Sequence, residues 1–368
     1  MSKKSLKTLF LLVLCLAIIF TSSLYVFAAI SSNFYSYFVN GTTAYPNLKT
    51  LISNNYTDLQ NNYTTTSTSS LDLYAEKVSS SYTFISPNDM KGTSNSCSYT
   101  IQGICYNTIG STTYTLISAY NNAGGTSAIF ATTDNTNYTK IIVSGQSTHF
   151  GGIASSGGYT YVACTDYIIR ISDSTLSSYL SSSTSLTGNN NITRQTTVPS
   201  TGVTTIKLPS SVKASFLAYE SSTDLLWIGT FSTTTSSSYM YGFNGSTADS
   251  TANNATISTY KYKMAIPTCS QGASFRDGKV IITRSYCRTP TNDSYVSEMY
   301  CYSSYSKSGT TATLGSVTKK YMLPSMAEGV YIGATYTYVV YESNSGEYYD
   351  GALRCTHILA TPTTSLYS

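Results

Sequence analysis

A phrase that recurs five times constrains the fold of this chain more than any other feature of its sequence. Each copy begins with a polar or small residue, often followed by glycine, and continues into an apolar stretch, a short turn and a second, aromatic-rich stretch. A period of this size, filled with short strands, is typical of small sheets repeated around an axis. The copies begin 49 to 64 residues apart, at Gln102, Gly151, Ser215, Gln271 and Glu328.

Individual strands can be traced inside the repeat. The second copy carries a polar, irregular insertion at Ser181–Ser200, and its fourth strand resumes near 204–208. Turn-forming Asn, Asp and Gly residues separate the strands of the first copy. The four strands of that copy are predicted at about 101–107, 113–120, 127–132 and 138–143.

The two ends of the repeat region differ in a way that predicts ring closure. The last copy has no room for a fourth strand, whereas one spare strand, Ser81–Ser86, precedes the first copy. We therefore expect an all-β, five-bladed β-propeller in which this N-terminal strand pairs beside Leu353–Ala360 and closes the last blade. A six-bladed ring is the alternative, because residues 173–200 have room for a degenerate element.

The N-terminus has the pattern of a secretory leader. Three lysines precede an apolar run at Thr8–Phe20, and Val26-Phe27-Ala28 offers a small-residue cleavage site. The alternative is an uncleaved membrane anchor, because the apolar stretch continues to Ile30 and about 20 apolar residues span a bilayer. Either reading predicts a secreted or cell-surface protein. The expected organisation is 1–28 leader, 29–77 a Ser/Thr/Asn-rich segment and linker, 78–361 the propeller and 362–368 a tail.

Charge and cysteine content exclude several classes of site. The formal net charge is +4, and the leader supplies three lysines of it, which leaves +1 for residues 29–368 and makes nucleic acid an unexpected partner. There is no CxxC pair and there are only two histidines, so a zinc site is not expected. Cys287 and Cys301 flank a turn-rich stretch and would face each other across a hairpin, either as a disulfide or as two half-buried thiols.

Two stretches, from Gln271 to Tyr302 and from Leu323 to Ser343, resemble a group of secreted bacterial β-propeller proteins without an assigned activity. The resemblance covers roughly residues 80–360. It implies the propeller fold and export, and it implies no reaction; that group is expected to have glycine where Cys287 stands. Five-bladed propellers also include glycoside hydrolases and sugar-binding lectins, which is an analogy of fold alone.

Propeller geometry narrows the search for a site. The first strand of each blade lines the central channel and the second runs back antiparallel, so first-strand starts and second-strand ends share one face. The sequence places polar groups at these positions, and we expect them around one mouth of the channel. The candidate ligand-binding residues are Gln102, Tyr120, His149, Asp166, Gln271, Tyr286, Arg288, Glu328 and Glu342.

Each candidate also has a structural interpretation. Glu328 and Glu342 fit the carboxylate pair of glycoside hydrolysis or a calcium site built with carbonyl oxygens. They equally fit ion pairs with Arg284 or Arg288 that hold two blades together. The glutamines before glycine fit groups that satisfy backbone atoms between blades.

These observations favour an exported, non-catalytic binding protein that takes a small or carbohydrate-like ligand at the channel mouth. No nucleophile elbow, P-loop or HExxH motif is present, and no cofactor is expected, calcium excepted. A secreted, glycosidase-like hydrolase that uses Glu328 or Glu342, with or without calcium, is the second hypothesis. A structural cell-surface module is the third.

Overall fold

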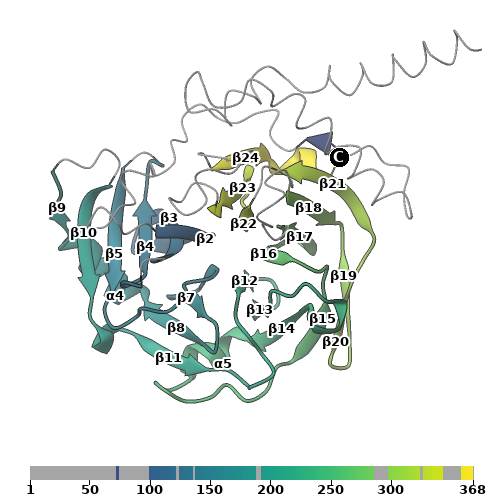
Figure 1. Cartoon of the computed structure of the whole chain (residues 1–368), viewed down its shortest axis with the longest axis horizontal. Helices are drawn as coiled ribbons and strands as arrows, with labels where there is room; N and C mark the ends of the chain where they lie inside the picture. The colour runs from purple at the N-terminus through teal and green to yellow at the C-terminus, as the bar shows by residue number, and fades with distance from the viewer. Residues whose placement is uncertain are drawn as a thin grey trace, which may run out of the picture.

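The strands of this protein form five sheets arranged around a central axis (Figure 1). The structure is a computed structural model that describes residues 72–73, 99–121, 124–135, 137–187, 192–285, 297–323, 326–342 and 358–367. In each sheet the first strand lies innermost and pairs antiparallel with the next strand outward. The fold is therefore an all-β propeller, as the repeat predicts.

Four of the sheets contain the four strands of a complete blade. The first has β2 (Tyr99–Ile109), β3 (Thr112–Asn121), β4 (Ala128–Thr132) and β5 (Tyr138–Val143). The second has β6 (Ile153–Ser156), β7 (Tyr159–Cys164), β8 (Tyr167–Ser172) and β11 (Thr204–Lys207). The third has β12 (Phe216–Glu220), β13 (Leu225–Gly229), β14 (Tyr239–Asn244) and β15 (Tyr262–Ala265). The fourth has β16 (Ser270–Arg276), β17 (Lys279–Arg284), β18 (Ser297–Tyr302) and β21 (Val317–Leu323).

The fifth sheet is incomplete, which corrects the prediction of five complete blades. It contains only β22 (Ala327–Ile332), β23 (Tyr336–Tyr341) and β24 (Leu359–Pro362) among the residues described. The strand expected to complete it, Ser81–Ser86, lies outside the described residues. Four complete blades and one three-stranded sheet are thus observed.

The six-bladed alternative is wrong for the part of the chain that the structure describes. The segment after Ser172 forms helix α4 (Asp173–Ser181), the short strand β9 (Thr184–Ser185) and strand β10 (Ile192–Val198). Strand β10 pairs parallel with β5, so this insertion widens the first sheet and makes no sheet of its own. The expectation of an irregular segment at Ser181–Ser200 is also wrong, because this range contains strands β9 and β10.

Two other segments also add to the outer edge of a sheet. The hairpin of β19 (Tyr305–Ser308) and β20 (Thr311–Leu314) pairs with β15, and β1 (Asp72–Leu73) pairs with β21. Both additions are parallel, like that of β10. The remaining short elements are α5 (Gly245–Ser250), η1 (Ser200–Gly202), η2 (Thr235–Ser237) and η4 (Thr363–Leu366).

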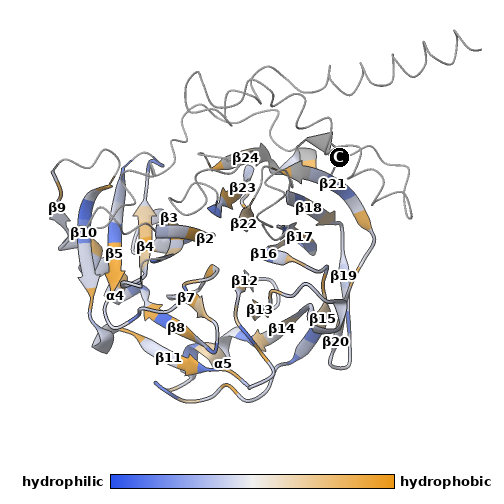
Figure 2. Ribbon diagram, viewed as in Figure 1, coloured by the Kyte–Doolittle hydropathy of each residue, from blue (hydrophilic) through white to orange (hydrophobic). Residues whose placement is uncertain are grey.

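Five apolar clusters hold the ring together, one between each pair of neighbouring sheets. One of them joins the fifth sheet to the first, where Val340 of β23 packs with Ile104 of β2. The innermost strands also contact each other in cyclic order, β2–β6–β12–β16–β22 and back to β2. The sheets that carry these clusters contain both hydrophobic and hydrophilic residues, as Figure 2 shows. The described residues therefore form a closed ring without the N-terminal strand.

Glycines allow the innermost strands to approach closely. A Cβ atom on Gly329 would lie 2.6 Å from the Cα of Gly103, and one on Gly152 would lie 2.5 Å from the backbone nitrogen of Leu217. These contacts narrow the axis at the starts of the inner strands. Among the described residues, no helix has the length and apolar character needed to span a bilayer.

Candidate functional site

Six of the nine candidate residues come together in one cluster, called here the glutamate cluster. They lie where the sequence places them, at the starts of inner strands and at the ends of second strands. Its members are Gln102, Tyr120, His149, Gln271, Glu328 and Glu342.

Hydrogen bonds run through the cluster from one sheet to the next. Gln271 Nε2 donates to Glu328 Oε1 at 2.9 Å, and Gln102 Nε2 donates to Glu342 Oε1 at 3.0 Å. The other end of the Gln102 amide, Oε1, lies 2.8 Å from His149 Nε2. The Tyr120 ring stacks on the His149 ring, with centroids 4.0 Å apart. The cluster therefore links the fourth, fifth, first and second sheets.

The charge of one glutamate of the cluster acts on the other. Burial, followed by the charge of Glu342, raises the pKa of Glu328 well above its ordinary value. The amide of Gln271 opposes this shift by donating to the charged form. Burial in this cluster therefore favours the protonated form of Glu328 over a wider pH range than for an exposed glutamate.

Three members of the cluster are buried, whereas Tyr120 and Gln271 are half-buried and His149 is exposed. The expectation of a ligand at the channel mouth stays a prediction. Gln102, Glu328 and Glu342 are 6%, 2% and 7% exposed. The physical reason is the close approach of the glycine-bearing inner strands, which brings the side chains of neighbouring sheets together. No group of three His, Cys, Asp or Glu side chains suited to a metal occurs within the described ranges, and the calcium hypothesis stays a prediction.

The other candidates are separate from the cluster. Asp166 is exposed and forms an ion pair with Lys213 at the surface. Tyr286 and Arg288 lie outside the described residues. Arg284, named as a partner for the glutamates, instead pairs with Glu298, with 2.7 Å between Nη1 and Oε2.

Of the two cysteines for which a disulfide or two half-buried thiols were the alternatives, only Cys301 lies within the described residues. Cys301 is a buried free thiol, and burial raises its pKa to about 12. The antiparallel register sets Cys301 opposite Ile281 of β17, six positions before Cys287, which lies outside the described residues. The choice between the two alternatives therefore stays a prediction.

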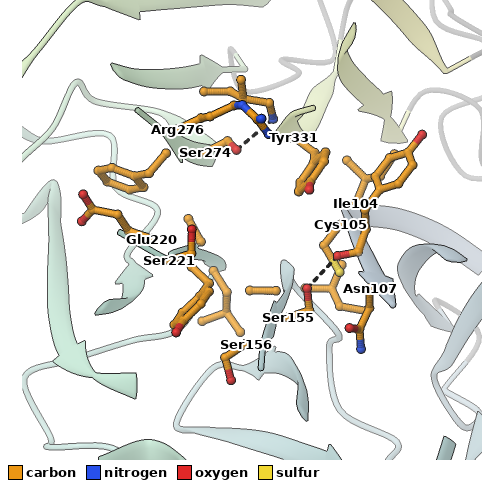
Figure 3. Close-up of a pocket in the computed structure, with 18 of the residues that line it drawn as sticks. Ile104, Cys105, Asn107, Ser155, Ser156, Glu220, Ser221, Ser274, Arg276 and Tyr331 are labelled. Atoms are coloured by element: carbon orange, nitrogen blue, oxygen red, sulfur yellow. Dashed lines mark hydrogen bonds between the residues drawn. The ribbon is translucent and has the colours of Figure 1, made fainter. Parts of the chain in front are cut away.

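A cavity of about 470 Å³ lies at the opposite end of the inner strands. We call it the central pocket (Figure 3). It is lined by the last residues of β2, β6, β12, β16 and β22 and by the turns that follow several of them. None of the candidate residues lines this pocket, because the candidates were placed at the starts of first strands and the ends of second strands. The polar residues at the ends of the inner strands are the sequence signal that would have indicated it.

The polar groups of the central pocket come from different sheets. Asn107 Nδ2 donates to Asp173 Oδ1 at 2.7 Å and to Thr160 Oγ1 at 3.0 Å, which fixes the amide beside the first residue of α4. Ser155 Oγ donates to the carbonyl of Tyr106 at 2.7 Å (Figure 3). Arg276 is the one cation among the lining residues. It lies 3.4 Å from the exposed Asp277 carboxylate, a weak surface pair.

Aromatic and sulfur side chains form one wall of this pocket. The rings of Tyr106 and Tyr331 stack with centroids 4.9 Å apart, and Tyr331 faces the opening in Figure 3. Burial, followed by the nearby Cys105, raises the pKa of Tyr331 to about 12, against the opposing effect of Arg276. Burial also raises the pKa of the Cys105 thiol far above its ordinary value, so this sulfur is a poor nucleophile.

Glu220, at the pocket edge, is saturated by donors. Its carboxylate accepts hydrogen bonds from the Trp227 indole and from the hydroxyls of Thr223 and Tyr305. Tyr305 belongs to the β19–β20 hairpin, so this buried carboxylate fastens the hairpin to the third sheet. The hydrogen bonds of Glu220 therefore stabilise the fold, and its carboxylate is turned away from the cavity.

Comparisons with known proteins do not identify a family for this chain. No protein-family model matches the sequence, and no curated protein matches it. Among solved structures, the Dos1 propeller is 13% identical at a TM-score of 0.32, over 67% of this chain and 56% of that one. BamB from Moraxella catarrhalis is 10% identical at a TM-score of 0.30, over 68% and 56%. Virginiamycin B lyase from Staphylococcus aureus is 12% identical at a TM-score of 0.30, over 67% and 92%.

Proposed function

We propose that this chain is an exported, non-catalytic binding protein that takes a small, carbohydrate-like ligand in the central pocket. The observation that carries the proposal is the cavity of about 470 Å³, which all five sheets line. Its volume lies in the range of small-molecule sites. The proposed ligand position is thus at the ends of the inner strands, where the cavity lies.

The lining chemistry fits a ligand rich in hydroxyl groups. A sugar hydroxyl both donates and accepts, and the pocket offers an acceptor in Asp173, a donor in Arg276 and a fixed amide in Asn107. Tyr331 supplies an aromatic surface of the kind that stacks on pyranose rings. One cation beside three carboxylates does not form the basic surface that a strongly anionic ligand requires.

The hydrolase alternative has less support from the geometry. Glycosidase carboxyl groups flank a bound sugar at separations of roughly 5–9.5 Å. Glu328 and Glu342 instead are buried and lie at the end of the inner strands opposite the central pocket. Within the pocket, Glu220 is saturated and the Cys105 thiol is held protonated.

The fifth blade is part of the same proposal. We infer that the three-stranded sheet is the fifth blade, because its inner strand contacts those of both neighbours and its faces carry two of the apolar clusters. Its completion by Ser81–Ser86 stays a prediction. Export is likewise an expectation, and the N-terminal sequence of protein recovered outside the producing cell checks cleavage after Ala28.

A binding screen of neutral saccharides and other small polar compounds tests the ligand. Arg276→Ala should weaken binding of any compound found by about tenfold to a hundredfold, since a hydrogen bond to a charged group is worth roughly 1.5–3 kcal/mol. Asn107→Ala should weaken it by up to about tenfold, since a neutral hydrogen bond is worth roughly 0.5–1.5 kcal/mol. Lys213→Ala, at the surface ion pair with Asp166, is the matched control and should bind normally. Undiminished binding by both pocket variants would reject the site, and turnover of a bound saccharide would reject the non-catalytic assignment.

A further inference from the structure

The three carboxyl groups that line the central pocket differ in how far the protein itself balances their charge. The carboxylate of Glu220 is surrounded by donors, and Lys307 Nζ lies 3.7 Å from its Oε2. Asp277 is exposed and lies 3.4 Å from the guanidinium of Arg276. The charges of these two carboxylates are therefore balanced by neighbouring side chains or by solvent.

Asp173, the third carboxyl group, has acceptor positions that the protein leaves unused. Among the residues described, its carboxylate accepts one side-chain hydrogen bond, from the neutral amide of Asn107 at 2.7 Å, and forms no ion pair with a lysine or arginine. An ionised carboxylate has about four acceptor positions. This half-buried carboxylate can therefore accept further hydrogen bonds from a molecule in the pocket.

The place of Asp173 in the fold does not occupy the rest of its side chain. It is the first residue of helix α4, where a negative charge is favourable, but the Thr175 amide is capped by Ser172 Oγ at 3.1 Å. The backbone nitrogen of Asp173 donates to the carbonyl of Gly158 at 2.8 Å, which holds the residue at the β6–β7 turn. Its backbone and Asn107 thus fix Asp173 beside the pocket, and its second carboxylate oxygen remains available.

The cation of the pocket lies in a different part of the wall. The Asn107 amide that holds Asp173 belongs to β2, and its other acceptor, Thr160, belongs to β7 of the second sheet. Arg276 ends β16, in the fourth sheet, and Figure 3 shows Arg276 and Asn107 on different sides of the opening. In the cyclic order of the inner strands, β22 separates β16 from β2, and β12 separates it from β6. A ligand can therefore turn a positive group toward Asp173 and keep it away from Arg276.

We propose that the ligand of the central pocket is an amino sugar, a ring rich in hydroxyl groups with one protonated amine, and that Asp173 binds the amine. This inference rests on the function proposed above and narrows it to a chemical class. An ammonium group offers three donors and a positive charge, which match a carboxylate that lacks a cation. The hydroxyl groups of the ring accept hydrogen bonds from Arg276.

The rest of the lining has the same preference. It carries one cation against three carboxylates, so a positive ligand meets a wall of opposite net charge. The stacked rings of Tyr106 and Tyr331 add to this, because aromatic faces attract cations. A sugar with its own carboxylate would compete with Asp277 for Arg276 and would be repelled by Asp173. A neutral sugar would leave Asp173 without a counter-ion.

Binding of matched sugars to the purified protein tests the charge of the ligand. The probes are glucosamine, galactosamine and mannosamine, measured by calorimetry at mildly acidic pH, where the amine is protonated. Each is compared with its parent sugar and with its N-acetylated form, which are both neutral. At least one amino sugar should bind about tenfold more tightly than both of its neutral forms, the effect of one hydrogen bond to a charged group. Cyclohexylamine, a ring with an amine and no hydroxyl group, should bind more weakly than that amino sugar.

Asp173→Asn tests the residue, since it keeps the shape and the acceptor for Asn107 and removes the charge. The affinities of the amino sugar and of its parent sugar should become nearly equal in this variant. A loss of folded protein would lower both affinities alike and cancels in their ratio, and Tm should change by about 2 °C or less. Asp277→Asn is the matched control: it makes the same chemical change in the same pocket, and the preference for the amine should persist in it.

The failure of this inference and that of the proposed function give different results. Parent sugars that bind as tightly as amino sugars, with binding still weakened by Arg276→Ala, would reject the amino-sugar class and retain the pocket. A preference for the amine that survives in Asp173→Asn would also reject the inference, as would cyclohexylamine that binds as tightly as the sugars or the absence of binding by every probe. An amino sugar that binds equally well to Asp173→Asn, Asn107→Ala and Arg276→Ala would reject the central pocket itself.

Discussion

Glycine at the second position of four of the five copies decides how closely neighbouring sheets approach. A Cβ on Gly103 would lie 2.7 Å from the backbone nitrogen of Ile153 and 2.8 Å from the Cα of Gly152. These neighbours are backbone atoms, which cannot rotate away as a side chain can. The exception is the third copy, where Phe216 takes this position and its ring covers Gly229, the residue opposite it on β13.

Gly103→Ala should therefore destabilise the protein by about 1–3 kcal/mol, the usual cost of an extra methyl group in a packed interior. Gly157→Ala is the control: it lies in the β6–β7 turn, and an added Cβ would meet nothing within 4 Å. Chemical denaturation of both variants measures the difference. Equal stability of the two variants would show that the inner strands can separate without cost.

At the residue scale, the sequence predicts that the residues of the glutamate cluster lie near one another, but it does not predict the central pocket. Gln102, His149, Gln271, Glu328 and Glu342 could be placed together because strand starts and antiparallel strand ends share a face of a propeller. How deeply these residues are buried depends on the distances between sheets, and the pattern of strands in a sequence does not give those distances.

At the scale of elements, the insertion after Ser172 contains a helix and a strand that its polar sequence does not predict. Ser172 caps helix α4, with its hydroxyl accepting from the Thr175 amide at 3.1 Å. Leu176 and Leu180, four residues apart, are the buried residues of this helix. Two apolar residues among serines give a weak periodicity, so the sequence favoured an irregular segment. The parallel pairing of β10 with β5 is a long-range contact and has no local signal.

The helix should nevertheless contribute to stability, because Leu176 is fully buried in the apolar cluster between the first and second sheets. Leu176→Ala should cost about 2–5 kcal/mol through lost burial and the cavity left behind. Ser177→Ala, on the exposed side of the same helix, should change stability by less than about 0.5 kcal/mol. Urea unfolding of the two variants compares them; a neutral Leu176→Ala would mean that α4 only covers the sheets.

At the scale of the whole molecule, the ring has two unlike ends. The starts of the inner strands are joined by the glutamate cluster, and their other ends surround the central pocket. The repeat predicted the ring because each copy encodes one hairpin near the axis. It could not predict which end would be hollow, because both ends present polar residues along the sequence.

Completion of the fifth sheet is the last expectation open to a direct test. If Ser81–Ser86 is its fourth strand, deletion up to residue 77 should leave Tm nearly unchanged, since β1 contributes only two paired residues. Deletion up to residue 90 should lower Tm by about 5–10 °C, because an aromatic side chain buried in a sheet stabilises by roughly 1.5–3 kcal/mol and this segment carries Tyr82 and Phe84. Tyr82→Ser with Phe84→Ser in the longer chain should reproduce most of that loss. Equal Tm for the two deletions would show that the three-stranded sheet closes the ring unaided.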